Sequence, residues 1–420
     1  MVRARRTAGV AGLAVAALAL AACGGGTGAD SSSDDDGGKA SSITLVAAEY
    51  SKENTAKFWN QFATKFKEKT GTTLNVQVVS WNDIDQQSST MIQNGNPPDI
   101  LNLNAYASYA KDGLLYSADE VLPSAVKSDL LEAFVASGTY DGKLYGMPDL
   151  SSARALFYNK ALFARAGIAA PPKTWAEFEE DAKKITALGA GSIGYAMPLG
   201  PEEAQAEFSI WAFNNGGAWK TDGKWSINSP ANVETLAFLK KLADEKVTQN
   251  NPGRTNRTDG AFALFGSGKA GMVVGFSPLS ATLDTEKKVQ YGIAPMPTSD
   301  GGPSQTYGVT DYLMAFKKDG NADAVKAFYE LYYQPDQVNE FIKAEGFLPV
   351  TKSGLEVFSS QPELKVYLDT LPNIHLTPTD DPTWDTVKLA VQQNLGLAVA
   401  PDGNPQKVLD DLQAKAEAGS

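Results

Sequence analysis

The sequence predicts an α/β protein with two lobes and a helix-rich C-terminal part. Strand-like and helix-like segments alternate in the first part of the chain, which is typical of a parallel sheet covered by helices. The 420 residues exceed the usual size of one hydrophobic core. We therefore expect two lobes with a cleft between them.

The expected elements follow from the spacing of apolar residues. A short apolar run predicts a buried strand at the start of the globular part, and Phe58, Phe62 and Phe66, four residues apart, predict an amphipathic helix after it. Glycine and proline separate the later helices. The expected segments are strands over 43–48, 73–79, 100–103 and 272–274, helices over 55–69, 86–93, 175–188, 232–246, 322–333 and 383–397, and a final helix that begins at Pro405.

Polar and aromatic side chains directly follow three of these strands. They are Glu49, Trp81, Asn104 and Tyr106. In sheets of this class ligands bind beyond the carboxyl ends of the strands. Sugars offer hydroxyls to polar side chains and a weakly apolar ring face to aromatic ones. These residues indicate a ligand cleft, although Trp81 also fits a half-buried core position and Glu49 also fits a charge that favours the next helix.

The N-terminus has the order of a secretory signal peptide, predicted over 1–22. Three arginines precede an apolar run over 8–22, which is short for a transmembrane helix of about 20 residues. The run ends in Leu-Ala-Ala-Cys, which resembles the lipobox of bacterial lipoproteins and implies that Cys23 is lipidated. Cys23 is the only cysteine, so an internal disulfide is excluded. The alternative is an ordinary signal peptide in which Cys23 is incidental.

Residues 23–42 consist largely of Gly, Ser and Asp, which predicts a disordered tether. The tether and the lipid would hold an exported protein at the outer face of the bacterial cytoplasmic membrane. Loss of the three leader arginines lowers the count of Lys and Arg from 37 to 34, against 49 Asp and Glu, which gives a net charge of −15. This charge disfavours nucleic acid as a partner and a polybasic membrane-binding patch.

Residues for catalytic and metal sites are scarce. The only histidine is His375, so Ser-His, Cys-His and clustered His designs lack the side chains they need. The segment FGSGKAG at 265–271 lacks the Gly-Lys-Ser/Thr pattern of a phosphate loop. We therefore expect a binding protein with no enzymatic activity, cofactor or metal. A secreted glycosidase is a less favoured alternative, because paired carboxylates and aromatic residues would also suit one.

Several short motifs follow one another along the chain. The longest reads YGMPDLSSARALFYNKALFARAGIAAPPKT at 145–174 and is followed by Trp175. Others are NGNPPDIL at 94–101, YAKDGLL at 109–115, FGSGKAGM at 265–272 and YGIAPMP at 291–297. Together they resemble the family 1 extracellular solute-binding proteins, the maltose-binding-protein-like capture subunits of carbohydrate ABC importers.

The resemblance implies a type II periplasmic-binding-protein fold, in which two lobes close around a ligand in the interlobe cleft. By this likeness the first lobe takes residues 43–149 plus 299–335 and the second takes 150–298 plus 336–420. It also implies a mono- or oligosaccharide ligand, delivery to a membrane permease, and a monomer. A glycerophosphate-type or polyol ligand is the alternative, since relatives that take phosphorylated polyols share these motifs.

The resemblance also assigns positions in the cleft. Arg154 would favour a carboxylate, a phosphate or a dense hydroxyl cluster, and its alternative partner is Asp149 in an ion pair. Trp211 would share a helix face with Glu207, and its alternative is a core position. The residues expected to contact ligand are Glu49, Trp81, Asn104, Tyr106, Ser152, Arg154, Glu207, Trp211, Phe276, Asp311 and Trp384, with Trp81 and Trp384 as the strongest candidates.

Overall fold

The computed structural model describes residues 40–361, 364–370 and 374–419. The predicted signal peptide, Cys23 and nearly all of the predicted tether lie outside this part of the chain. Strand β1 begins at Ser42, one residue before the predicted strand and inside the predicted tether. No helix of the described residues is both long and apolar enough to cross a membrane.

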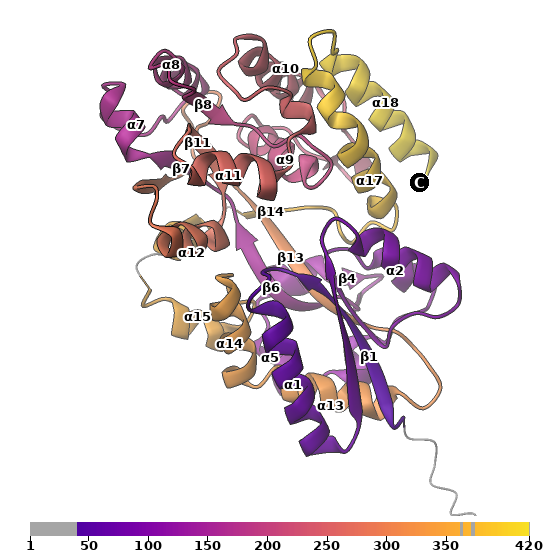
Figure 1. Ribbon diagram of the computed structural model, residues 1–420. Coiled ribbons are helices and arrows are strands. Elements are labelled where there is room, and N and C mark those ends of the chain that lie inside the picture. Colours follow the sequence, from indigo (N-terminus) through magenta and orange to yellow (C-terminus); the bar gives the residue numbers. More distant parts are fainter. Residues whose placement is uncertain (1–39, 362–363, 371–373, 420) are drawn as a thin grey trace, which may run out of the picture. The chain divides into compact units, whose positions relative to one another are not determined.

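The first sheet has six strands and is parallel only in part (Figure 1). Strand β1 runs parallel to β2 along its whole length, from Ser42 opposite Thr73 to Glu49 opposite Ser80. Strand β13 returns antiparallel beside β3 and β6. The parallel pairing expected from the sequence is found between β1 and its neighbours β2 and β3, whereas β13 departs from it. The six strands are β1 (Ser42–Glu49), β2 (Thr73–Ser80), β3 (Ile100–Leu103), β6 (Met147–Ala153), β13 (Thr306–Ala315) and β14 (Ile374–Leu376).

Helices with an aromatic face cover this sheet. Phe58 and Trp59, on α1 (Thr55–Thr70), stack on Phe341 and Tyr332 with ring centroids 4.5 and 5.5 Å apart. Tyr332 ends α13 (Ala322–Tyr332) and Phe341 lies in α14 (Pro335–Glu345). The predicted boundary at residue 336 assigns α14 to the other lobe, whereas its aromatic side chain completes the core under α1. The other elements of this region are α2 (Ile84–Gln93), α3 (Ala107–Lys111), α4 (Ala118–Val121), α5 (Ser124–Asp129), α6 (Glu132–Ser137), β4 (Thr139–Tyr140), β5 (Lys143–Leu144) and α15 (Lys352–Phe358).

The second sheet has four strands in the order β12 (Tyr291–Ala294), β7 (Ala155–Asn159), β11 (Ala270–Gly275) and β8 (Ile193–Ala196). Strand β6 of the first sheet ends at Ala153 and β7 of the second begins at Ala155, so Arg154 alone separates them. The predicted boundary after Asp149 falls inside β6, which is paired with β13 through Ala153. The chain therefore passes from the first sheet to the second at Arg154.

Helices around the second sheet follow the predicted segments closely. Helix α8 (Trp175–Thr186) begins with a capping box, in which the Thr174 hydroxyl accepts from the Glu177 amide at 3.2 Å. The core around the second sheet contains buried aromatic side chains, among them Phe178, Tyr195 and Trp211. The remaining elements are α7 (Lys160–Arg165), α9 (Ala204–Phe213), β9 (Lys220–Thr221), β10 (Lys224–Trp225), α10 (Pro230–Asp244), η1 (Pro252–Arg254), η2 (Arg257–Phe262), α11 (Ala263–Gly266), α12 (Ser277–Glu286), α16 (Lys365–Thr370), α17 (Trp384–Asn394), η5 (Leu395–Val399) and α18 (Pro405–Ala418).

Candidate functional site

A cavity lies where residues from both sheets meet. The space between its side chains is about 700 Å³, counting the part that is open to solvent. Six of the predicted contact residues line it: Trp81, Asn104, Ser152, Arg154, Phe276 and Asp311. Trp81, Asn104 and Phe276 each come directly after a strand, at its carboxyl end. That these six contact a ligand stays a prediction.

Five other predicted contact residues lie outside this cavity. Glu49 is the last residue of β1, and the next side chain, Tyr50, takes the lining position. Tyr106 is buried, and its hydroxyl donates to the Ser137 carbonyl at 3.0 Å. Glu207 and Trp211 are buried in the core of the second sheet and bond to each other through the indole N–H at 2.9 Å.

Trp384, one of the two strongest candidates, also lies outside the cavity. Only 2% of its surface is exposed, and it packs on Trp219 and Trp225 with ring centroids 5.4 and 6.3 Å apart. Trp384 lies on the side of helix α17 that packs into the core, to which helix α18 also contributes. Trp384 is therefore a packing residue, and the prediction that it contacts a ligand is corrected.

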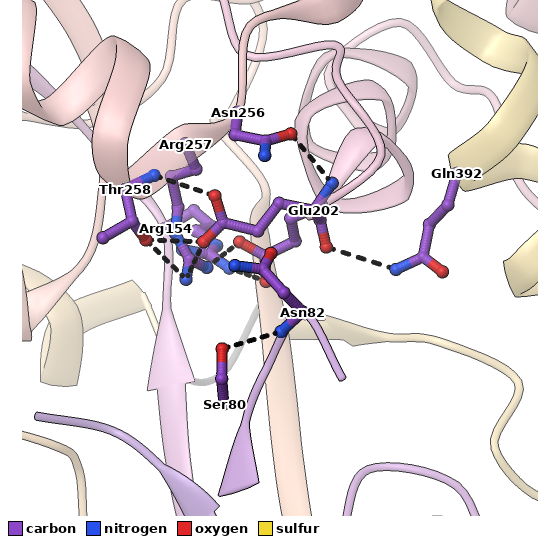
Figure 2. Close-up of polar contacts among 9 residues, drawn as sticks. Ser80, Asn82, Arg154, Glu202, Asn256, Arg257, Thr258 and Gln392 are labelled. Atoms are coloured by element: carbon purple, nitrogen blue, oxygen red, sulfur yellow. Dashed lines mark hydrogen bonds and ion pairs between the residues drawn. The ribbon is translucent and has the colours of Figure 1, made fainter. Parts of the chain in front are cut away.

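Two arginines and two glutamates form one charged part of the cavity wall. Figure 2 labels three of these residues, Arg154, Arg257 and Glu202. Arg154 donates from Nη2 to Glu203 Oε1 at 2.6 Å. Arg257, at the start of the π-helical turn η2, pairs with Glu203 through Nη1 and with Glu202 through Nη2 at 3.1 Å. Asp149, the alternative partner predicted for Arg154, instead accepts from the Asn102 amide at 3.0 Å. We call Arg154, Arg257, Glu202 and Glu203 the arginine–glutamate cluster.

Phe276 faces this cluster. The guanidinium carbon of Arg154 lies 4.1 Å from the centroid of the Phe276 ring, and that of Arg257 lies 5.0 Å from it. A cation over an aromatic face is attracted by the ring electrons. The Phe276 ring, expected to stack on a sugar, thus also holds the two arginines in place.

Lys388 supplies the third positive charge, from helix α17. Its Nζ lies 3.1 and 3.2 Å from the carboxylate oxygens of Asp85 and 3.0 Å from Asn104 Oδ1. Burial by itself lowers the pKa of Lys388, but the carboxylates of Asp85 and Asp385 raise it above its ordinary value. Lys388 is therefore protonated, and its positive charge is balanced by the Asp85 carboxylate.

Asp311 is a buried carboxyl group in the cavity wall. Its Oδ2 accepts from the Tyr50 hydroxyl at 2.8 Å, whereas Oδ1 has no partner among the described residues. Burial raises the pKa of Asp311 to about 7, and the charge of Glu203 adds to the rise while the Tyr50 hydrogen bond opposes it. Asp311 therefore changes its protonation state near neutral pH.

The predicted set lacks several lining residues. Tyr50, Glu202, Glu203, Gln205, Arg257 and Lys388 all line the cavity. Glu202 and Glu203 follow strand β8 after a Pro-Leu-Gly-Pro turn, so the rule that favours the carboxyl ends of strands could have found them. Within the described part of the chain, no group of three or more His, Cys, Asp or Glu side chains is arranged to hold a metal.

Solved structures share this fold. An ABC transporter solute-binding protein of Thermotoga lettingae, bound with α-D-tagatose, has a TM-score of 0.78 at 20% identity and covers 90% of this chain and 99% of its own. A maltose-bound protein of T. maritima has a TM-score of 0.77 at 21% identity, with the same coverage. A solute-binding protein of Agrobacterium radiobacter in complex with ribitol has a TM-score of 0.76 at 21% identity and covers 90% of this chain and 98% of its own. The two-lobed α/β fold is thereby confirmed.

Sequence relatives agree with the structural ones. A putative binding protein of Brucella abortus is 30% identical over 388 residues, which cover 90% of this chain and 93% of that protein. The sn-glycerol-3-phosphate-binding periplasmic protein of the same organism is 32% identical over 279 residues, which cover 62% of this chain and 63% of that protein. Residues 61–366 match the family described as bacterial extracellular solute-binding protein. This chain therefore belongs to the bacterial extracellular solute-binding proteins, a family of transport binding proteins.

Proposed function

We propose that this chain is the capture component of an ABC importer and that its cavity takes an uncharged polyhydroxylated solute, a mono- or oligosaccharide or a polyol. The observation that carries the proposal is a set of buried polar atoms in the cavity wall with no partner among the described residues. Asp311 Oδ1 and Gln205 Oε1 are acceptors, and Arg257 Nε is a donor. Buried polar groups normally have partners, and a hydroxyl both donates and accepts.

Aromatic side chains beside these atoms support a sugar-like ligand. Tyr50, Trp81 and Phe347 line the same cavity, with Tyr50 edge-on to the other two rings at 5.7 and 5.0 Å between centroids. Aromatic faces suit the weakly apolar face of a sugar ring. The combination of unpartnered polar atoms and aromatic rings fits a polyhydroxylated ring or chain better than an apolar solute.

The charge balance of the cavity favours a neutral ligand. Its three cations, counted over the described residues, are Arg154, Arg257 and Lys388, and each is paired with at least one carboxylate. An anionic ligand would compete with these carboxylates for the same N–H groups. The relatives bound to tagatose, maltose and ribitol are consistent with a neutral solute.

The second candidate is a glycerophosphate-type ligand. It is favoured by the relatives that bind sn-glycerol-3-phosphate and by the presence of two arginines in the cavity wall. Guanidinium groups recognise phosphate well when their N–H groups are free. The pairing of both arginines with glutamates is the reason for preferring the neutral ligand.

We also propose that a lipid anchor holds the protein at the membrane surface and that ligand binding closes the two lobes. Lipidation of Cys23 and the tether predicted over residues 23–42 would keep a monomeric receptor near its permease. The passage of the chain between the two sheets at Arg154, which itself lines the cavity, would couple ligand binding to hinge closure. The lipobox-like sequence before Cys23 supports the anchor.

A thermal-shift screen tests the ligand class. Sugars and polyols should raise the Tm, because a ligand at about 100 times its Kd stabilises the folded state by about 2.7 kcal/mol. Inorganic phosphate and sn-glycerol 3-phosphate should leave the Tm unchanged at equal ionic strength. A shift with sn-glycerol 3-phosphate and with no neutral compound would overturn the proposed ligand class in favour of the second candidate.

A further inference from the structure

One carboxylate holds both arginines of the cavity. Each oxygen of Glu203 contacts a different guanidinium: Oε1 contacts Arg154 at 2.6 Å, and Oε2 contacts Arg257. The side chain of Arg154 is 4% exposed and that of Glu203 is 16% exposed, so water screens this pair weakly. The arginine–glutamate cluster carries two positive and two negative charges, and its net charge is zero.

We propose that Glu203 determines the charge specificity of the cavity. By occupying N–H groups of both arginines, Glu203 leaves their other N–H groups to serve neutral hydroxyls and prevents the pair from binding an anion. This inference rests on the proposed function, which it deepens by assigning one residue to the exclusion of phosphorylated solutes. It implies that loss of the Glu203 charge would leave Arg154 and Arg257 with one more positive charge than Glu202 balances, and thus able to bind an anion.

Electrostatics explains why an anion is rejected while Glu203 is charged. A phosphate group that approached Arg154 and Arg257 would also approach Glu202 and Glu203, and like charges at short distance repel strongly in a site with little water. Asp311 lines the same cavity and adds to the repulsion when its carboxyl group is ionised. A neutral hydroxyl meets no such penalty and can accept a hydrogen bond from a guanidinium that is already paired.

The arginines have supports other than Glu203. Arg154 rests on Phe276, and Arg257 is paired with Glu202, which accepts in turn from the Thr258 amide at 2.9 Å. Replacing Glu203 with Gln keeps its shape and removes its charge. We therefore expect Glu203→Gln to keep both guanidinium groups at the cavity wall and to give the cluster a net charge of +1.

Calorimetric titration with inorganic phosphate and sn-glycerol 3-phosphate tests the proposal. We expect Glu203→Gln to bind both compounds about 10- to 100-fold more tightly than the wild type, the range that one charge-assisted hydrogen bond provides. Glu203→Asp, which keeps the charge, and Glu49→Gln, which removes one charge outside the cavity, should show no gain. No gain in Glu203→Gln, or an equal gain in Glu49→Gln, would overturn the proposal.

Two further measurements keep the test decisive. If Glu203→Gln does not fold, Glu202→Gln also removes one negative charge from the cluster and should gain phosphate affinity, and a folded Glu202→Gln without gain would overturn the proposal. Tight binding of sn-glycerol 3-phosphate by the wild type would overturn it directly. Failure of every neutral sugar and polyol to bind the wild type would contradict the proposed function. The effect of Glu203 is measured separately, with inorganic phosphate and sn-glycerol 3-phosphate.

Discussion

Trp384→Ala is expected to lower the free energy of unfolding by about 3–5 kcal/mol, the usual cost of truncating a buried tryptophan. The loss of contacts with Trp219 and Trp225 leaves a void in the core beneath α17 and α18. Because Trp384 lies outside the cavity, the Kd of the folded protein should stay unchanged. Urea unfolding followed by circular dichroism gives the stability, and calorimetric titration of the folded protein gives the affinity.

Trp81→Ala is the matched control, because it removes the same side chain from the cavity wall. Trp81 is half-buried, so its loss should affect stability less and should weaken ligand binding by about 10-fold through lost stacking. A Trp384→Ala protein that remained as stable as the wild type, or lost affinity as strongly as Trp81→Ala, would contradict the assignment of Trp384 to the core.

Asp311→Asn should weaken ligand binding by about 10- to 100-fold at a pH of about 8, since it removes from the cavity wall a charged acceptor whose second oxygen has no partner among the described residues. The pKa of Asp311 is raised to about 7, mainly by burial. Wild-type affinity should therefore rise as the pH goes from about 6 to about 8, because the carboxylate accepts a ligand hydroxyl better than the acid does. The variant should show a flat profile over the same range in calorimetric titrations.

Asp149→Asn provides the control for Asp311→Asn. Asp149 is also fully buried, and burial raises its pKa to about 8, but it lies outside the cavity. Its replacement should change stability and leave the pH dependence of binding as in the wild type. Equal affinity of wild type and Asp311→Asn at both ends of the pH range would show that the free oxygen of Asp311 does not contact ligand.

Much of the local structure could be predicted because it depends on neighbouring residues. The strand expected over 73–79 and the helix expected over 55–69 each match the observed element within one residue. The antiparallel strand β13 could not be predicted in the same way. It pairs with β3 and β6, which lie more than 150 residues earlier in the chain, and apolar periodicity does not reveal partners at that distance.

The strand-end rule predicted those lining residues of the cavity that directly follow a strand. Trp81, Asn104 and Phe276 lie at such ends, and all three line the cavity. Trp384 was assigned to the cleft by the family resemblance, and the sequence does not distinguish a tryptophan that faces a ligand from one that faces a core. Lys388 was missed because its partner Asp85 lies 303 residues away in the chain.

The pairing of charges could not be predicted from sequence either. An ion pair with Asp149, five residues away, was the alternative considered for Arg154, but extended backbone carries the two side chains to different partners. Glu203 reaches Arg154 only because the second sheet brings the turn after β8 to the start of β7. This pairing decides whether the arginines are free for an anion.

The most direct test of the central claim, that this cavity binds the solute, is a fluorescence titration of Trp81. Of the seven tryptophans, all within the described part of the chain, only Trp81 lines the cavity. A neutral sugar or polyol found in the thermal-shift screen should change the emission of the wild type saturably, and Trp81→Phe should lose this change while it still binds the compound in calorimetry. An unchanged emission response in Trp81→Phe would contradict the account, because the solute would then bind elsewhere.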